Sequence, residues 1–226
     1  MPKKAYIAII VLAILVVASV AAIYILQQPQ GNQTPSLAIG VKAGDTFTYN
    51  MTGTTEAYNE NTTIPENFLA VNMTEYYKVT ITDVESPIVS YNIIWQFKNG
   101  TQYNYNGKLN VANGANTQDF NYIYPANLAL SSPVRPELTD GPTVNETQTS
   151  TYLNGDRQTN IIRQQAVYYD STDLTYTKMY YDYKYIYVDS QTGMLVQFRD
   201  RQVYTDPQII LTVDWNLIDS NVLQVS

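Results

Sequence analysis

Two patterns of hydrophobic and polar positions divide this chain. From Ala5 to Leu26 there are 22 residues without a charge, and 13 of them are Ile, Leu or Val. At about 1.5 Å per residue, a helix of this length spans the roughly 30 Å hydrocarbon core of a bilayer. After Ser36 apolar and polar residues alternate instead. The sequence therefore predicts one N-terminal transmembrane α-helix within residues 1–26 and a β domain over residues 37–226.

Several segments after Ser36 alternate with the period of two that a half-buried β-strand requires. The clearest, at its C-terminal end, places five apolar side chains on one face: Ile209, Leu211, Val213, Trp215 and Leu217. Two more such faces are Val89, Tyr91, Ile93, Trp95 and Phe97, and Tyr77, Val79 and Ile81. Shorter candidate strands are Thr46 to Met51, Gln102 to Val111, Asn145 to Leu153 and Asn160 to Tyr169.

Short turns separate these segments. Asn99-Gly100 and Asn154-Gly155 favour the positive φ of two-residue hairpins, and Asp189 to Gly193 indicates a longer hairpin loop. Long helical patterns are missing, and Ser131 to Pro142, with three prolines, is expected to be irregular. Consecutive strands joined by short turns predict a mainly β fold, an antiparallel meander that forms a curved sheet, a half-barrel or a sandwich.

The N-terminal segment also predicts where the β domain lies. Lys3 and Lys4 precede the apolar run, so the positive-inside rule keeps the N-terminus cytoplasmic and places residues 37–226 outside the cell membrane. Residues 27–36 contain Pro and Gly and no charge, which predicts a flexible linker. The chain is thus expected to be a single-pass membrane protein with an extracytoplasmic C-terminal domain.

Three interpretations of the apolar run remain open. We expect an uncleaved signal anchor, because the run exceeds the roughly 7 to 15 apolar residues of a cleavable signal peptide. A cleaved signal peptide is an alternative, since Ser19-Val20-Ala21 offers small residues at suitable offsets. A pilin-type leader, with Lys3-Lys4-Ala5 before a helix that packs in a filament, is the third.

The composition removes most catalytic chemistry. The chain has no cysteine and no histidine, which excludes Ser-His-Asp and Cys-His catalysis and every thiolate or histidine metal site. Its net charge of −7 makes nucleic acid a poor partner. We therefore expect a protein that is not an enzyme, carries no cofactor and binds no nucleic acid.

Carboxylates are the catalytic groups that remain. Six aspartates lie in the C-terminal third of the chain: Asp170, Asp173, Asp182, Asp189, Asp200 and Asp206. Two carboxylates across a cleft suffice for a glycosidase, and the same oxygens could form a weak Ca²⁺ site. Such side chains on an acidic surface are more often solvated, so we expect no catalytic residue and no metal site.

One strand is unusually rich in tyrosine. Between Met179 and Val188, alternate positions on one face are Tyr181, Tyr183, Tyr185 and Tyr187. This face could bind a glycan or a lipid through ring stacking and hydroxyl hydrogen bonds, or it could simply cover the core. A hollow concave sheet lined by these rings would favour ligand binding, whereas a face filled by Trp95 and Trp215 would indicate a scaffold.

Asn-x-Thr sequons mark candidate glycosylation sites. Because the domain is expected outside the cell, we predict glycan acceptors at Asn50, Asn61, Asn72, Asn99 and Asn145. A further sequon at Asn32 is the weakest, because Pro35 follows it.

Several local strings resemble a recurrent, uncharacterised ectodomain of single-span archaeal cell-surface proteins. They are GVKAGDTFTY from Gly40, FKNGT from Phe97, IYPANL from Ile123, TVNET from Thr143 and VDSQTGML from Val188. The resemblance implies exposure at the cell surface and no known activity. The strand-turn-strand pattern with a D-x-x-T-G turn is also similar to lipoprotein-carrier half-barrels, which cradle acyl chains, although the helices that plug those barrels are not evident.

Together these patterns predict a non-enzymatic, membrane-anchored cell-surface protein that interacts with envelope proteins or other envelope components, or with neighbouring copies. The alternatives are an extracytoplasmic lipid- or glycan-binding module that uses the tyrosine face, and a pilin-like filament subunit.

Overall fold

The computed structural model describes residues 37–57, 70–153, 155–169, 178–206 and 208–223. The predicted membrane anchor at 1–26, the linker at 27–36, and Asn61, Asp170 and Asp173 lie outside this part of the chain. Within the described ranges, no helix has the length and apolar character needed to cross a membrane.

Strands dominate the described residues. Nine strands occur there: β1 (Thr46–Ala57), β2 (Thr74–Glu85), β3 (Ile88–Phe97), β4 (Gln102–Asn110), β5 (Glu146–Tyr152), β6 (Gly155–Tyr169), β7 (Met179–Asp189), β8 (Leu195–Thr205) and β9 (Gln208–Ser220). Helix in the same residues is limited to one turn at 70–72. The predicted mainly β class is confirmed, and all nine strands belong to one open, curved, antiparallel sheet rather than to a sandwich.

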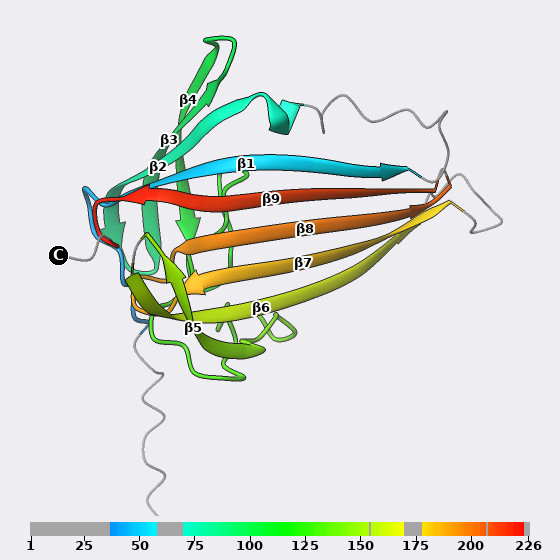
Figure 1. Cartoon of the computed structure of the whole chain (residues 1–226). Helices are drawn as coiled ribbons and strands as arrows, with labels where there is room; N and C mark the ends of the chain where they lie inside the picture. The colour runs from blue at the N-terminus through cyan, green and yellow to red at the C-terminus, as the bar shows by residue number, and fades with distance from the viewer. Residues whose placement is uncertain (1–36, 58–69, 154, 170–177, 207, 224–226) are drawn as a thin grey trace, which may run out of the picture. The chain divides into compact units, whose positions relative to one another are not determined.

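The strand order is β4-β3-β2-β1-β9-β8-β7-β6-β5 (Figure 1). Two meanders, β1 to β4 and β5 to β9, are joined where the first strand pairs with the last, over Phe47↔Ser220 to Ala57↔Ile209. The predicted hairpin at Asn99-Gly100 is confirmed, with a φ of 86° at Gly100, but its turn is longer than two residues, because the amide of Phe97 donates to the carbonyl of Thr101 and Asn99 does not have a positive φ. The short turns produce the two meanders, and the pairing of β1 with β9 joins these meanders into one sheet.

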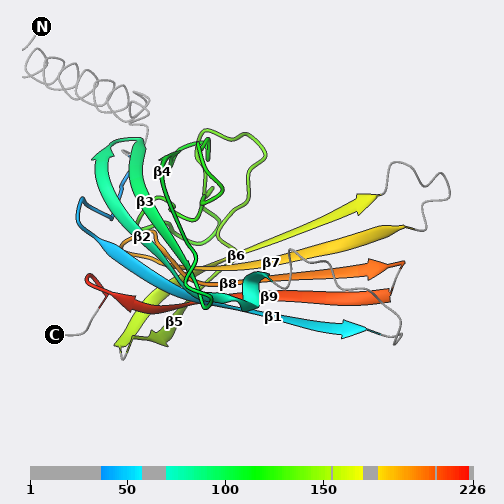
Figure 2. The ribbon, with the colours of Figure 1, turned by 90° about the horizontal axis from the view of Figure 1, so that it is seen from above.

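The segment 111–145, which we call the connection, leads from β4 to β5 and packs on one face of the sheet (Figure 2). We call this the covered face and the opposite one the outer face. Part of the connection, Ser131 to Pro142, was expected to be irregular, and it contains only an isolated bridge between Pro133 and Thr143. Val134 of this part is nevertheless buried in the core, as are Phe120, Ile123 and Val144 elsewhere in the connection.

Arg135 holds the connection together. Its guanidinium donates hydrogen bonds to the carbonyl oxygens of Val111 at 3.0 Å, Ile123 at 2.7 Å and Asn121 at 2.5 Å, and lies 4.4 Å from the ring centroid of Tyr124. Burial lowers the pKa of this guanidinium from its usual value. The buried backbone of an irregular segment needs donors of this kind, because no neighbouring strand supplies them.

Strict alternation separates the two faces of the sheet. One cross-strand row on the covered face consists of Ile162, Ile186, Phe198, Trp215 and Met51. The next row, on the outer face, consists of Arg163, Tyr185, Arg199, Asp214 and Thr52. The alternating apolar set predicted for β9 therefore faces the connection, with Trp215 5.0 Å from the ring of Tyr77.

The sheet has two unlike halves. The near half carries the connection and most of the core. The far half is made by the strand segments that run on beyond the connection, to the right in Figure 1. These segments are residues 163–169 of β6, 179–185 of β7, 199–205 of β8, 208–214 of β9 and 52–57 of β1.

Candidate functional site

The tyrosines predicted from the sequence form a column on the outer face of β7. Tyr181, Tyr183, Tyr185 and Tyr187 are all half-buried and point away from the face that carries Trp215. They do not line a hollow on the covered face, where Trp95 and Trp215 fill the near half around Tyr77. The rings therefore do not line a concave groove, because the odd positions of β7 face outward.

The column tyrosines differ from two core tyrosines in how their hydroxyl groups are used. Tyr49 donates to the carbonyl of Leu195 at 2.9 Å, and Tyr91 donates to that of Phe120 at 3.0 Å. Within the described residues, the hydroxyls of the four column tyrosines make no hydrogen bond. Only Tyr187 also packs against the core. The hydroxyl groups of the other three tyrosines can therefore still form hydrogen bonds with a ligand.

Arginines flank the column on both sides. Arg199 pairs with Asp214 at 2.7 Å and Arg163 pairs with Glu146 at 2.6 Å, so their charges are locally balanced. Asp214 also raises the pKa of Arg199. Arg201, opposite Tyr183, is exposed and has no ion-pair or hydrogen-bond partner among the described residues. The outer face thus offers ring surfaces, phenol hydroxyls and one unpaired guanidinium side by side.

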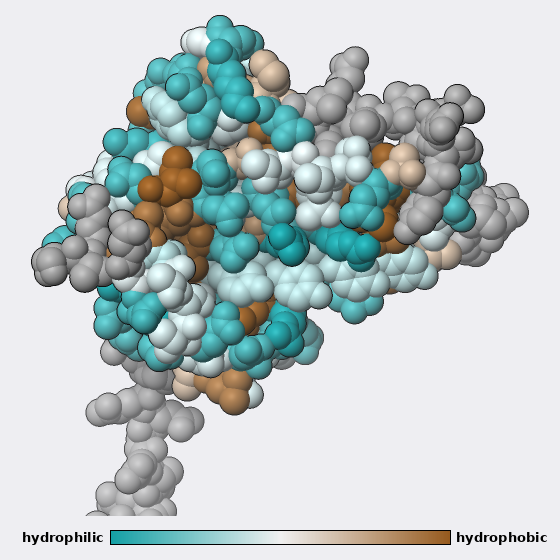
Figure 3. Space-filling view, in the orientation of Figure 1, coloured by the Kyte–Doolittle hydropathy of each residue, from teal (hydrophilic) through white to brown (hydrophobic). Residues whose placement is uncertain are grey.

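Figure 3 looks onto this outer face. The surface along β7 and β8 is pale to teal, which is the range of tyrosine and of the polar residues, while the strongly hydrophobic brown atoms lie in separate patches. An accessible surface with aromatic rings and polar groups can stack on the C–H faces of sugars and hydrogen-bond their hydroxyls. It does not enclose a ligand.

A second aromatic group lies on the covered face of the far half. Tyr168, Tyr180 and Tyr204 occupy one cross-strand row, with ring centroids 4.8 Å and 4.7 Å apart and nearly parallel planes. Reading the strands one at a time does not reveal this stack, because its three members come from three strands. The register between the strands creates it.

Two of the six aspartates meet beside this stack. Asp182 and Asp200 lie diagonally across β7 and β8, and Lys184 pairs with Asp182 at 2.9 Å. Each carboxylate has one buried oxygen, Oδ1, that has no hydrogen-bond partner. Burial and the neighbouring carboxylate of Asp182 raise the pKa of Asp200 to about 7. The two unpartnered oxygens thus belong to neighbouring carboxylates, and such a pair is unfavourable when both are ionised.

Metal binding has little support in these residues. Among the described part of the chain, no group of three or more His, Cys, Asp or Glu side chains could hold a metal ion. Asp206 lies in the turn after β8, so it belongs to none of the cross-strand rows that contain Asp182 and Asp200. The ammonium of Lys184 already occupies one side of Asp182.

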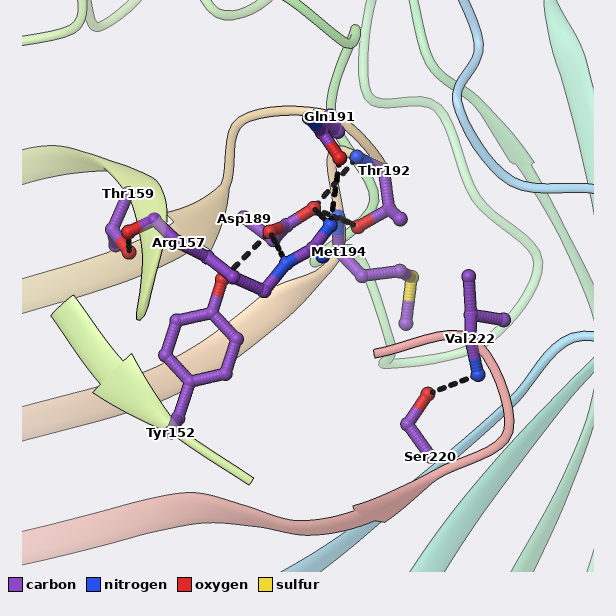
Figure 4. A network of polar contacts seen from close by, with 9 residues as sticks. All are labelled: Tyr152, Arg157, Thr159, Asp189, Gln191, Thr192, Met194, Ser220 and Val222. Atoms are coloured by element: carbon purple, nitrogen blue, oxygen red, sulfur yellow. Dashed lines mark hydrogen bonds and ion pairs between the residues drawn. The ribbon is translucent and has the colours of Figure 1, made fainter. Parts of the chain in front are cut away.

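Asp189 has a different role from Asp182 and Asp200. Its buried carboxylate accepts hydrogen bonds from the Tyr152 hydroxyl at 2.6 Å, Arg157 Nε at 2.7 Å, and the amide and hydroxyl of Thr192 at 2.8 Å each (Figure 4). Burial alone would raise its pKa, but these donors outweigh burial and lower it. The Asp189 carboxylate therefore fixes the β7–β8 turn.

Gly193 completes that turn. Its φ is 72°, and a Cβ placed on it would lie 2.0 Å from the carbonyl oxygen of Tyr124 in the connection. Only glycine fits this close approach. The D-x-x-T-G string singled out in the sequence is therefore a structural element that docks the connection onto the sheet.

The predicted glycan acceptors differ in how their side chains are used. Both amide atoms of Asn72 are bonded to the backbone of Gly53, at 2.8 and 3.0 Å, and the Oδ1 of Asn50 is buried. Asn99 and Asn145 are exposed, and only their Oδ1 atoms accept hydrogen bonds from neighbouring residues, Thr101 and Arg163. Glycosylation stays a prediction, best suited sterically to Asn99 and Asn145.

A scan against protein-family models found no match, and no curated protein matches this chain. The chemistry of the described surfaces is therefore the basis for any functional assignment.

Proposed function

We propose that this chain is a non-enzymatic, membrane-anchored cell-surface protein that binds an uncharged envelope glycan across the outer face of β7 and β8. The observation that carries this proposal is the column of Tyr181, Tyr183 and Tyr185, whose hydroxyls make no hydrogen bond within the described residues, beside the unpaired Arg201. Tyr49 and Tyr91 use their hydroxyls within the core, whereas the column hydroxyls stay available to a ligand.

A glycan fits this face better than a lipid does. An acyl chain is bound by enclosure in an apolar pocket, and the column lies on an accessible face with polar surroundings (Figure 3). Sugar rings instead stack on phenol rings and accept hydrogen bonds from hydroxyls and a guanidinium. An uncharged glycan is favoured over an acidic one because the chain itself carries a net charge of −7.

The non-enzymatic part of the proposal rests on composition and on geometry. The chain has no histidine or cysteine, and its carboxylate pair, Asp182 and Asp200, faces away from the tyrosine column. A substrate lying on the column would therefore not reach these two carboxylates.

Retention on immobilised polysaccharides tests the proposal. The full chain in detergent is applied to mannan, dextran and galactan, with polygalacturonate as the acidic comparison. We expect retention on at least one uncharged polymer and an affinity about tenfold lower for Tyr183→Ala, since losing a stacked ring costs about 1.4 kcal/mol. Tyr168→Ala, an exposed tyrosine on the covered face, is the matched control and should bind like the wild type. No retention on any uncharged polymer, or equal loss in both variants, would overturn the proposal.

The membrane anchor is tested separately. The uncharged run from Ala5 to Leu26 after Lys3 and Lys4 supports an extracytoplasmic domain. Protease added to intact cells should therefore cleave the chain beyond residue 36. Protection in intact cells whose surface is permeable to the protease, with cleavage only after lysis, would contradict this orientation.

A further inference from the structure

The far part of β6 has no strand paired to its outer side among the described residues. β5 pairs with β6 only between Gly155 and Ile161, while β6 continues to Tyr169 against β7. Among the described residues no strand follows β6 on its outer side beyond Ile161 (Figure 1). The segment 163–169 thus forms the border of the far half.

Two hydrogen bonds show which backbone groups point outward from this edge. The amide of Asn145 donates to the carbonyl of Ile161 at 2.9 Å, and the amide of Arg163 donates to the side chain of Asn145 at 2.6 Å. In an antiparallel ladder the outward residues alternate, so Gln165 and Val167 come next. Neither has a backbone partner on this side within the described residues.

This edge lacks the features that normally prevent edge pairing. Proteins protect free edges with charged side chains, proline or β-bulges. The segment Gln164 to Tyr169 (QQAVYY) has no charge and no proline, and its register with β7 runs without a shift. Val167 and Tyr168 are 37% and 44% exposed, which is high for such residues in a strand.

We propose that this edge pairs with the same edge of a second copy of the chain, antiparallel about a twofold axis at Ala166. Copies with a net charge of −7 repel one another, so a contact is favoured where the surface is neutral, as it is here. In this register the outward groups of Gln165 meet those of Val167 of the other copy, which forms four backbone hydrogen bonds. The twofold axis thus gives every outward backbone group of Gln165 and Val167 a partner in the other copy.

The side chains also agree with this register. Ala166 faces Ala166 of the second copy at a non-hydrogen-bonded position, where Cα atoms approach to about 4.5 Å. Gln164 lies opposite Tyr168 of the other copy, which covers part of that exposed ring. Because the axis is perpendicular to the sheet, both tyrosine columns remain on one outer surface. The pairing does not depend on the glycan-binding proposal.

Disulfide trapping tests both the pairing and its register, because the natural chain has no cysteine. The full chain in detergent carries Ala166→Cys, is oxidised mildly, and is analysed on a non-reducing gel. A separation of about 4.5 Å between Cα atoms lies within the range that a disulfide spans. We expect most of Ala166→Cys to migrate as a dimer. The matched control is Gln165→Cys on the same strand. In the proposed register residue 165 faces Val167 of the second copy rather than residue 165, so this variant should stay largely monomeric.

A second variant keeps the test independent of the introduced thiol. Val167→Lys places a charge on the edge of each copy and should weaken the dimer at least tenfold in sedimentation experiments, with an unchanged melting temperature at concentrations where both chains are monomeric. A monomeric wild-type chain, equal cross-linking of both cysteine variants, or a ladder of larger oligomers from head-to-tail pairing would each overturn the twofold dimer.

Discussion

The near and far halves of the sheet share strands but differ in how their polar groups are used. In the near half, the Asp189 carboxylate receives five hydrogen bonds and the Tyr49 hydroxyl is bonded to Leu195. In the far half, two carboxylate oxygens of Asp182 and Asp200 have no partner, and Arg201 is unpaired in the described residues. The Asp189 network stabilises the near half, whereas the far half contains a carboxylate pair that can titrate and an exposed guanidinium that can bind a ligand.

The largest effect should follow from breaking the near-half network. Asp189→Ala leaves the Arg157 guanidinium, the Tyr152 hydroxyl and two groups of Thr192 without their acceptor. We expect a loss of about 3 kcal/mol in the free energy of unfolding, measured with urea. Asp214→Ala breaks the more exposed ion pair with Arg199 and should cost less than about 1 kcal/mol. Similar losses in the two variants would remove the distinction between the halves.

Two Tyr→Phe variants compare how much a single hydroxyl contributes to the unfolding free energy in each half. Tyr49→Phe leaves the buried carbonyl of Leu195 without its donor and should cost about 1 to 1.5 kcal/mol in unfolding free energy. Tyr183→Phe removes a hydroxyl that has no partner within the described residues, and should change stability by less than about 0.3 kcal/mol. A destabilised Tyr183→Phe would mean that the column hydroxyls are structural.

The smallest effect is a pH dependence at the carboxylate pair. The pKa of Asp200 is raised from 3.8 to about 7 in the folded chain, so the folded state holds this proton more tightly than the unfolded state does. Stability from this group is therefore present in acid and lost as pH rises from about 4 to about 7. Asp189, whose pKa is lowered, acts in the opposite sense and loses its contribution only as pH falls below about 4.

Asp200→Asn should remove the pH dependence of stability that comes from Asp200. We expect the stability of the variant relative to the wild type to rise by about 1 kcal/mol between pH 5 and pH 8, after solvent screening is allowed for. Comparing the two chains isolates Asp200, because all other groups titrate in both. Parallel melting profiles from pH 5 to pH 8 would show that the pair holds no proton.

Alternation along single strands predicts much of this architecture. It places Tyr181, Tyr183 and Tyr185 on one face, and it separates Trp215 from Asp214, as the cross-strand rows confirm. It does not reveal which face is covered. The connection decides that, and an irregular segment held by Arg135 carries no periodic signal.

Groups that depend on strand register could not be predicted in the same way. Tyr168, Tyr180 and Tyr204 stack only because three strands align at that row, and Asp182 meets Asp200 for the same reason. The six aspartates were visible as candidates in the sequence, yet neighbours in the chain gave no indication of which two would meet. The unpaired edge of β6 likewise follows from the short length of β5.

Chemical footprinting of the tyrosines tests the central claim most directly, since it needs no substitution. The full chain is nitrated with and without saturating mannan, dextran or galactan, and the rates at individual tyrosines are measured by mass spectrometry. The account predicts at least threefold slower modification of Tyr181, Tyr183 and Tyr185, with unchanged rates at the exposed Tyr103 and Tyr168. Protection of Tyr168 with no protection of the column would contradict it.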